Sequence, residues 1–188
     1  MGVSRWIKVR VGVNAVMDED GGGTNMSHKA ILRSIAAAIF ALCILAGAMA
    51  QMPNPYGPAI SLENAKKAAE PAVAEATKNH WTVAVAIVGP GGTLIYFEKM
   101  DNTQLGSAEV AMDKARTAAA FKRPTKAFQD ALAAGGDGLR VLGLKGVTPV
   151  EGGIPLLLDG KIVGAIGVSG ATSAQDAQCA KAGADMVK

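Results

Sequence analysis

Apolar residues recur at helical spacing in the stretch "LENAKKAAEPAVAEATKNH", which follows Ser61. The side chains with this spacing are Leu62, Ala65, Ala69, Val73 and Ala76. The pattern predicts a helix with Ser61 as its N-cap. Pro71 lies inside it, and proline removes a backbone hydrogen bond and clashes with the preceding turn, so we expect a kink or a split into two helices there.

Two later segments are typical of β-hairpins. The β-branched and alanine run 82–88 is followed by a second apolar run, 93–100, and "GPGG" between them can adopt the positive φ values of a hairpin turn. The segment "IPLLLDGKIVGAIGVSG" contains Asp159-Gly160, another strong turn signal. Both segments predict antiparallel strand pairs.

The remaining pattern is helical. We expect Ser107 to cap a helix over "AEVAMDKARTAAAFKR" that ends before Pro124, and Thr125 to cap a helix over "KAFQDALAA". Residues 137–153 are glycine-rich and predict a long loop, and "SAQDAQCAKAGADMVK" predicts a closing helix. Two hairpins covered by helices indicate a single α+β domain.

Residues 26–50 have the three-part layout of a secretory signal peptide. Lys29 and Arg33 precede an apolar run, 35–46, and Ala48-Met49-Ala50 forms a cleavage site after Ala50. The run is shorter than the roughly 20 residues that a membrane-spanning helix needs, so we expect a periplasmic or secreted chain without a membrane span. We expect residues 1–25 to be a start-site extension or a disordered tail, 51–59 a proline-rich lead-in, and 60–188 the folded domain.

Charge and cysteine content exclude several classes of function. Residues 51–188 contain 14 basic and 13 acidic residues, a net charge of about +1, which does not favour nucleic acid as a partner. Cys179 is the only cysteine after residue 50, so no internal disulfide is possible there. His80 is the only histidine after residue 50, which excludes a multi-histidine metal site within one chain.

The stretch from Gly164 to Ala171 consists almost entirely of small side chains where a strand leads into a helix. One interpretation is that another element packs very closely against it. The alternative is that the turn Gly167-Val168-Ser169-Gly170 offers backbone N–H groups to an anion, such as a heme propionate or a phosphate. Both alternatives remain open at this point.

Three blocks in this order resemble the GlcG/HbpS family of small heme-binding proteins: "VAVAIVGPGGTLIYFEKMD", "SAEVAMDKARTAAAFKRPT" and "GGIPLLLDGKIVGAIGVSGATSAQDAQCAKAGADMV". The resemblance covers residues 60–187 and extends to the C-terminal domain of the PduO corrinoid enzymes. It implies a profilin-like fold with about five antiparallel strands flanked by helices. It also implies homo-oligomers and a tetrapyrrole ligand, mostly heme.

Members of this family are associated with a threonine oxygen as heme ligand. The block "KARTAAAFKRPT" suggests Thr117 first and Thr125 second, with Lys114 pairing with a propionate and Phe121 on the same helix face. The alternatives are that Thr117 bonds its own helix backbone, that Thr125 is a plain N-cap, and that the basic residues are solvated.

Two further residues are candidates for the site. His80 has an imidazole, which binds iron far better than a hydroxyl does, although its place at the end of a helix also suits a C-terminal cap. Asp101 follows the second strand, where the family pattern has an acid, but it has no partner histidine nearby in sequence.

Two hypotheses of different classes follow. The first is an exported, homo-oligomeric heme-binding protein that scavenges, buffers or senses heme. The second is an enzyme or an enzyme accessory subunit that binds a small organic acid or a corrinoid, with its anionic group at Gly167, Ser169 and Gly170.

Overall fold

The structure, a computed structural model, describes residues 54–187, so the expectations for 1–25 and 26–50 lie outside the described residues. The elements are α2 (Leu62–Lys78), β1 (Ala84–Val88), β2 (Leu94–Lys99), α3 (Ser107–Phe121), α4 (Lys126–Ala133), the 3₁₀ helix η1 (Gly136–Gly143), β3 (Gly153–Leu158), β4 (Lys161–Ser169) and α5 (Ser173–Ala184). This is the expected α+β order, except that the predicted loop 137–153 begins with a 3₁₀ helix.

The sheet has four antiparallel strands in the order β2-β1-β4-β3, with both predicted hairpins present. The expectation of five strands is therefore wrong for the described part of the chain. Backbone hydrogen bonds instead join the lead-in to β4: Gly57 N donates to Ile162 O at 2.9 Å, and Ile162 N donates to Pro55 O at 2.8 Å. The lead-in, which shows no core pattern, thus pairs with the start of β4, beyond the point where β1 ends at Val88 opposite Ala165.

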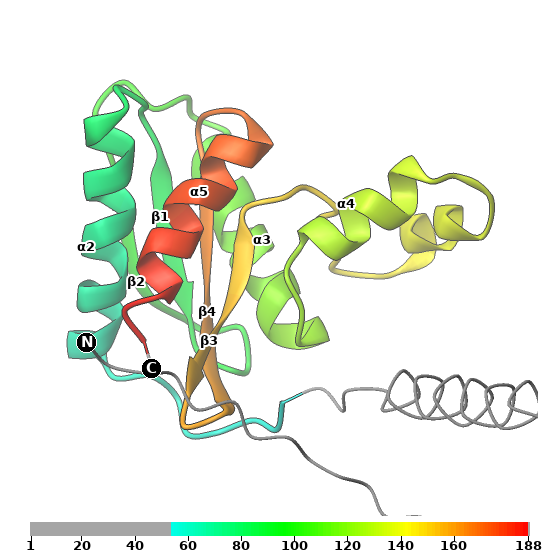
Figure 1. Cartoon of the computed structure of the whole chain (residues 1–188), viewed down its shortest axis with the longest axis horizontal. Helices are drawn as coiled ribbons and strands as arrows, with labels where there is room; N and C mark the ends of the chain where they lie inside the picture. The colour runs from blue at the N-terminus through cyan, green and yellow to red at the C-terminus, as the bar shows by residue number, and fades with distance from the viewer. Residues whose placement is uncertain (1–53, 188) are drawn as a thin grey trace, which may run out of the picture. The chain divides into compact units, whose positions relative to one another are not determined.

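Helices cover both faces of the sheet. Helices α2 and α5 pack on one face and α3 on the other (Figure 1). The α2/α5 side contains the larger aliphatic residues, such as Val85, Ile87 and Ile166. The α3 side is built mainly from alanines, including Ala86, Ala115 and Ala165.

The small side chains of β4 are explained by the close packing of α3 on this face of the sheet. A Cβ on Gly167 would overlap the Ala111 carbonyl oxygen of α3, and a Cβ on Gly153 would overlap the Lys114 carbonyl oxygen. These two glycines are register partners across β3 and β4. Close packing, the first of the two interpretations, therefore accounts for Gly167.

Helix ends agree with the sequence in part. Ser61 accepts a hydrogen bond from Asn64 N at 3.2 Å, as its N-cap role requires. Of the two alternatives expected at Pro71, a kink or a split, the split is wrong because α2 continues through that residue. The capping role expected of Ser107 is also wrong. Ser107 is the first residue of α3, and its buried hydroxyl has no hydrogen-bond partner among the described residues.

Between residues 54 and 187, no helix has the length and apolar character required to cross a membrane.

Candidate functional site

A groove of about 870 Å³ lies beside the exposed side of α3. Four segments line it: the lead-in through Tyr56, the β1–β2 turn through 90–92, α3, and the loop 145–148. Helix α3 contributes Asp113, Arg116 and Ala120, whose spacings of three and four residues place them on one side of the helix, and Phe121 from its last turn.

The groove carries positive charge on two of its walls. Arg116 projects from α3 and Lys145 from the loop, and both residues are exposed. The only ion pair of Arg116 within residues 54–187 is to Asp113, between Nη1 and Oδ1 at 3.1 Å, and both side chains are about half exposed. A pair held this loosely in solvent can exchange its partner for the anionic group of a ligand.

Aromatic side chains form one end of the groove. The Tyr56 hydroxyl donates to the Ala119 carbonyl at 2.8 Å, which fastens the lead-in to the last turn of α3. The Lys122 ammonium lies 4.2 Å from the centre of the Tyr56 ring. Phe121 packs edge-on against Phe128, with ring centroids 5.3 Å apart. The groove therefore combines an aromatic end with cationic sides.

Thr117 lies behind the groove wall and has no exposed surface. Its hydroxyl donates to the Gly146 carbonyl at 3.1 Å and accepts from Thr148 N at 2.9 Å. The hydroxyl thus holds the loop 145–148 against α3. It does not bond its own helix backbone, and in this arrangement it does not present a free oxygen to a ligand.

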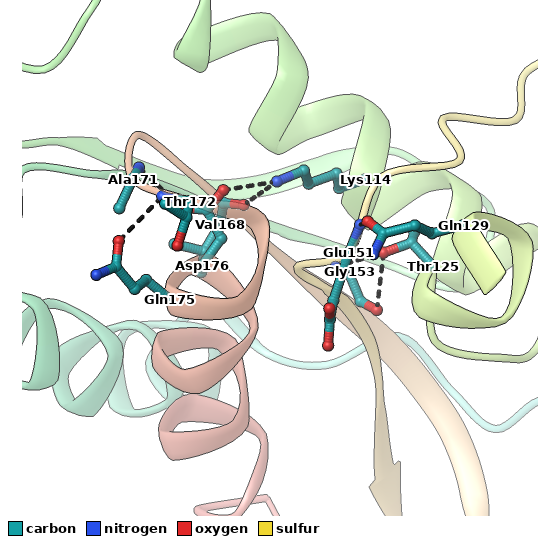
Figure 2. A network of polar contacts seen from close by, with 10 residues as sticks. All are labelled: Lys114, Thr125, Gln129, Glu151, Gly153, Val168, Ala171, Thr172, Gln175 and Asp176. Carbon is teal, nitrogen blue, oxygen red and sulfur yellow. Dashed lines mark hydrogen bonds and ion pairs between the residues drawn. The ribbon is translucent and has the colours of Figure 1, made fainter. Parts of the chain in front are cut away.

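Thr125 is buried at the start of α4, where its side chain makes no capping bond. Its hydroxyl instead accepts from Gly153 N at 2.8 Å, and Thr125 N donates to Gly153 O at 3.0 Å. Gln129 adds a contact to the same segment, since its side-chain oxygen accepts from Glu151 N at 2.9 Å (Figure 2). Thr125 therefore joins α4 to β3 and does not line the groove.

Lys114 points toward Asp176 and the end of β4 (Figure 2), and it is not among the residues that line the groove. Its side chain is 1% exposed, and its ammonium lies 2.8 Å from Asp176 Oδ2 and 3.0 Å from the Val168 carbonyl. Burial raises the pKa of the Asp176 carboxyl, while the hydrogen bond and positive charge of Lys114 act in the opposite direction. The structure thus leaves Lys114 neither solvated nor free to pair with a propionate.

The turn after β4 does bind an anion, but that anion belongs to the protein. Ala171 N donates to Asp176 Oδ1 at 3.0 Å, and the Gly170 backbone also hydrogen-bonds to this carboxylate. Gly170 has φ 151°, and a Cβ there would overlap the Thr82 carbonyl oxygen, so only glycine fits. The carboxylate of Asp176 occupies the place that the sequence suggested for a propionate or phosphate near Ser169.

His80 and Asp101 lie at the opposite end of the sheet from the groove. The register pairs Ala84 at the start of β1 with Lys99 near the end of β2 and with Ser169 at the end of β4. His80 precedes β1 and Asp101 follows β2, whereas the groove turn 90–92 follows the far end of β1. The five residues of β1 span about 16 Å between these two ends.

Of the candidates from the sequence, only Phe121 lines the groove and Thr117 supports its wall. Sequence reasoning missed Tyr56, Arg116, Lys145 and Thr148. The available signal was the spacing of Asp113, Arg116 and Ala120 on one side of α3. Nothing local in the sequence connects Tyr56 or Thr148 to that helix.

Within the described residues there is neither a metal-ion cluster nor a reactive thiol. Residues 54–187 hold no cluster of three or more histidine, cysteine, aspartate or glutamate side chains suited to a metal ion. Cys179 is buried, and burial together with the charges of Asp176 and Glu75 raises the pKa of its thiol to about 11. Such a thiol is an inert core residue at neutral pH.

Comparison with known proteins supports the resemblance seen in the sequence. A family profile described as "Haem degrading protein HbpS-like" matches residues 60–185. Protein GlcG from Escherichia coli K12 is 44% identical over 95 residues, which cover 50% of this chain and 69% of GlcG.

Two solved structures share the fold. A double mutant of HbpS from Streptomyces reticuli matches with a TM-score of 0.65 at 32% identity, covering 70% of this chain and 89% of that chain. A structure described as a PduOC:heme complex matches with a TM-score of 0.62 at 30% identity, covering 69% of this chain and 96% of that chain. The chain therefore belongs to the HbpS-like family.

Proposed function

We propose that the chain is an exported heme-binding protein that binds heme in the groove between α3, the β1–β2 turn and the loop 145–148. The observation that carries this proposal is the combination of Phe121, Arg116 and Lys145 around one space of about 870 Å³. That volume lies within the roughly 300–1,000 Å³ typical of small-molecule sites. The PduOC:heme complex adds support, because a protein of the same fold binds this ligand.

The lining residues fit the two kinds of surface that heme presents. Phe121, Val147 and Ala120 can contact the flat apolar macrocycle. Arg116 and Lys145 can pair with the two propionates, since guanidinium and ammonium groups form charge-assisted hydrogen bonds with carboxylates.

The iron would have only weak protein ligands in this groove. The side chains lining it include no histidine, cysteine or methionine, and the available oxygen donors are those of Tyr56, Asp113 and Thr148. Imidazole, thiolate, thioether and tyrosinate are the usual axial ligands, and Tyr56 is the only lining side chain of these types, so it is the group to test first. Weak ligation suits exchangeable heme, as in scavenging, buffering or sensing.

The same two cations favour a second candidate, a small organic acid or a corrinoid bound by an enzyme or accessory subunit. Arg116 and Lys145 would hold a carboxylate of either ligand. We favour heme over a small acid because a small acid would not contact the aromatic side chains at the end of the groove.

The test is a hemin titration of the purified protein followed by absorbance. We expect saturable binding, weakened roughly tenfold in the double variant Arg116→Ala/Lys145→Ala, because two exposed ion pairs contribute up to about 1 kcal/mol each. The matched control is Lys66→Ala/Lys78→Ala, which removes two exposed cations from α2 on the other face of the sheet.

Each outcome of the titration has a separate meaning. No saturable binding by the wild-type protein would contradict the proposed function. Equal loss in both double variants would indicate nonspecific attraction of hemin to positive charge. Decay of the Soret band over hours would indicate that the protein degrades heme as well as binding it. Saturable binding of a small carboxylate, with no binding of hemin, would favour the second candidate.

Export is tested by sequencing the amino terminus of the protein recovered outside the cytoplasm. The proposed cleavage after Ala50 predicts that the mature chain begins at Gln51. Recovery of the protein only in the cytoplasm with residues 26–50 intact would contradict this part of the proposal.

A further inference from the structure

Helix α4 and the 3₁₀ helix η1 form an arm that projects from the body of the domain (Figure 1). The two elements pack mainly on each other. The packing is close, because a Cβ on Gly138 would overlap the Ala131 carbonyl oxygen of α4. Bonds from Thr125 and Gln129 to the segment before β3 fix the arm at its base (Figure 2). The arm therefore presents a fixed outer surface away from the sheet.

Exposed leucines gather on the outer side of η1. The three-residue repeat of a 3₁₀ helix places Leu139 and Leu142 one turn apart in the same column, and they are 52% and 70% exposed. Val141, between them in sequence, is only 7% exposed and is the inward residue of this turn. Leu144, directly after η1, is 42% exposed. Exposed apolar surface gathered in this way marks contact with a protein or a membrane.

Two cations accompany these leucines. Arg140 lies between Leu139 and Leu142 in sequence, Lys145 follows Leu144, and both cations are exposed. Neither forms an ion pair with any residue in the part of the chain that the structure describes. The three leucines and the two cations together are called the η1 surface below. It combines apolar side chains with positive charge that lacks a counter-ion among residues 54–187.

Positive charge is concentrated in this part of the chain. Residues 122–150 contain five basic and two acidic residues, a net charge of +3. The other residues of 51–188 contain nine basic and eleven acidic residues, a net charge of −2. The acid on η1, Asp137, lies at the start of that helix, whereas Lys145 lies beyond its end. A partner of the η1 surface is therefore expected to offer negative charge as well as apolar groups.

An anionic lipid bilayer offers both. Leucine side chains enter the interfacial region of a bilayer, while neighbouring arginine and lysine side chains keep their charged groups at the level of the phosphates. The projection of the arm lets η1 reach a flat surface ahead of the sheet (Figure 1). Residues 137–150 contain no aromatic side chain, so this surface lacks the aromatic anchors that are enriched at the centre of protein interfaces.

We propose that the η1 surface binds the interfacial region of anionic lipid bilayers, with its leucines in the lipid and Arg140 and Lys145 at the phosphates. The proposal goes beyond heme binding and does not depend on it, because it rests on the leucines and cations of the arm. Its test uses protein without heme, so that the outcome for lipid and the outcome for heme are independent.

The first measurement is flotation of the protein with vesicles of phosphatidylcholine alone and with vesicles of equal parts phosphatidylcholine and phosphatidylglycerol. The protein begins at Gln51, so that the apolar run 35–46 does not contribute, and residues 52–188 form a compact unit of their own. We expect binding to the anionic vesicles that weakens with added salt, and weaker binding to phosphatidylcholine. Circular dichroism of each variant establishes that the fold is retained.

The leucines are tested by a double variant. Leu139→Gln/Leu142→Gln is expected to weaken binding to the anionic vesicles more than tenfold, because two apolar side chains no longer enter the bilayer. The matched control is Leu62→Gln/Leu105→Gln, which removes two leucines that lie outside the arm and are 51% and 87% exposed. This control should bind as the wild-type protein does.

The cations are tested by a single variant. Arg140→Gln is expected to weaken binding to the anionic vesicles about fivefold and to leave binding to phosphatidylcholine unchanged, because it removes one positive charge from the contact. The control is Lys66→Gln, which removes an exposed cation from α2 and should have no effect on either kind of vesicle.

A fluorescent label locates the contact on the protein. Gly143→Cys places a thiol beside Leu142, Gly106→Cys places one just before α3, and a Cβ at either glycine meets no atom within 4 Å. Cys179, the only other cysteine after residue 50, is buried and remains unlabelled. With nitrobenzoxadiazole on the thiol, anionic vesicles should shift the emission to shorter wavelength at position 143 and leave it unchanged at position 106.

Several results would overturn the proposal. One is a wild-type protein that floats with neither kind of vesicle, and another is a leucine double variant that binds as well as the wild type. Equal emission shifts at positions 106 and 143 would show that the contact is not made by the arm. Equal binding to both kinds of vesicle would exclude a role for Arg140 and Lys145. A leucine double variant with a lower molar mass by light scattering and unchanged vesicle binding would assign the leucines to contact between copies of this chain.

Discussion

Lys114 and Arg116 lie two residues apart on α3 and have opposite surroundings. The Lys114 side chain is 1% exposed and its ammonium is 2.8 Å from the Asp176 carboxylate. The Arg116 side chain is 44% exposed, and its only ion pair with a described residue is to the half-exposed Asp113. Helix geometry explains the contrast, because residues two apart point to different sides of a helix.

Lys114 is therefore a structural cation, whereas Arg116 is accessible to a ligand. On the inner side of α3, alanines and Gly167 bring the helix so close to the sheet that Lys114 is enclosed together with its counter-ion. On the outer side, Arg116 opens onto the groove. One face of α3 thus packs on the sheet, the other is open to the groove, and each face can be perturbed separately.

The largest expected effect on stability is at the inner face of α3, where Lys114 lies. Asp176→Ala leaves the Lys114 ammonium buried without a counter-ion, which we expect to lower the free energy of unfolding by about 3–5 kcal/mol. Denaturant unfolding measures the loss. The double variant Lys114→Met/Asp176→Leu should lose less than the single variant, because no unpaired charge remains.

The matched control for this pair is Glu63→Ala, which breaks the exposed ion pair of α2 with Lys67. We expect no measurable change in its unfolding midpoint. Equal effects of Asp176→Ala and Glu63→Ala would show that burial does not distinguish the two pairs.

A second variant tests the close approach of α3 to β4. Gly167→Ala forces a methyl group onto the Ala111 carbonyl oxygen, and we expect it to cost about 1–3 kcal/mol of stability. Gly91→Ala is the control, because a Cβ at Gly91 meets no atom within 4 Å, and thermal unfolding should place it close to the wild type. A neutral Gly167→Ala would mean that the two elements are not in close contact.

A third variant tests whether Thr117 of α3 holds the loop 145–148 in place. Thr117→Val keeps the shape of the side chain but removes the hydroxyl that holds the loop 145–148, and one lost hydrogen bond corresponds to about 1 kcal/mol. We expect the Thr148 amide to exchange its hydrogen about fivefold faster in protein without heme. Thr117→Ser retains the hydroxyl and should retain the slow exchange, whereas slow exchange in both variants would contradict the role of Thr117 in holding the loop.

The smallest effect is expected at Cys179, which shares its surroundings with Asp176. Because the pKa of the thiol is raised to about 11, the thiol stays protonated at pH 8 and becomes a thiolate only as the pH rises through that value. Iodoacetamide should leave the peptide containing Cys179 unmodified in the native protein and label it after denaturation, as measured by mass spectrometry. Rapid labelling of the native protein at pH 8 would contradict the burial of this side chain.

Local signals in the sequence were sufficient for most of the fold. Ser61 marks the start of α2, and Asp159-Gly160 forms the second hairpin with positive φ at both residues. The same local reasoning was wrong at Ser107, since a serine before an apolar run looks the same whether its hydroxyl caps the helix or is buried in its first turn.

The site was harder to predict because its residues meet only through tertiary contacts. Thr117 and Thr148 are 31 residues apart, and Lys114 and Asp176 are 62 apart. A basic residue that ends buried against a distant carboxylate has the same local pattern as one that faces a ligand. The helical position of Lys114 could therefore be predicted, but its pairing with Asp176 could not.

The most direct test of the central claim is an amide nuclear magnetic resonance spectrum of the protein loaded with ferric heme, with a diamagnetic gallium protoporphyrin complex as reference. Paramagnetic iron broadens the signals of nearby amides, so the spectrum locates the ligand. Binding in the groove predicts loss of the signals from Gly91, Gly92 and residues 146–148, with His80 and Asp101 unaffected. Broadening around His80 and Asp101, with the groove signals intact, would contradict the account and place heme at the opposite end of the sheet.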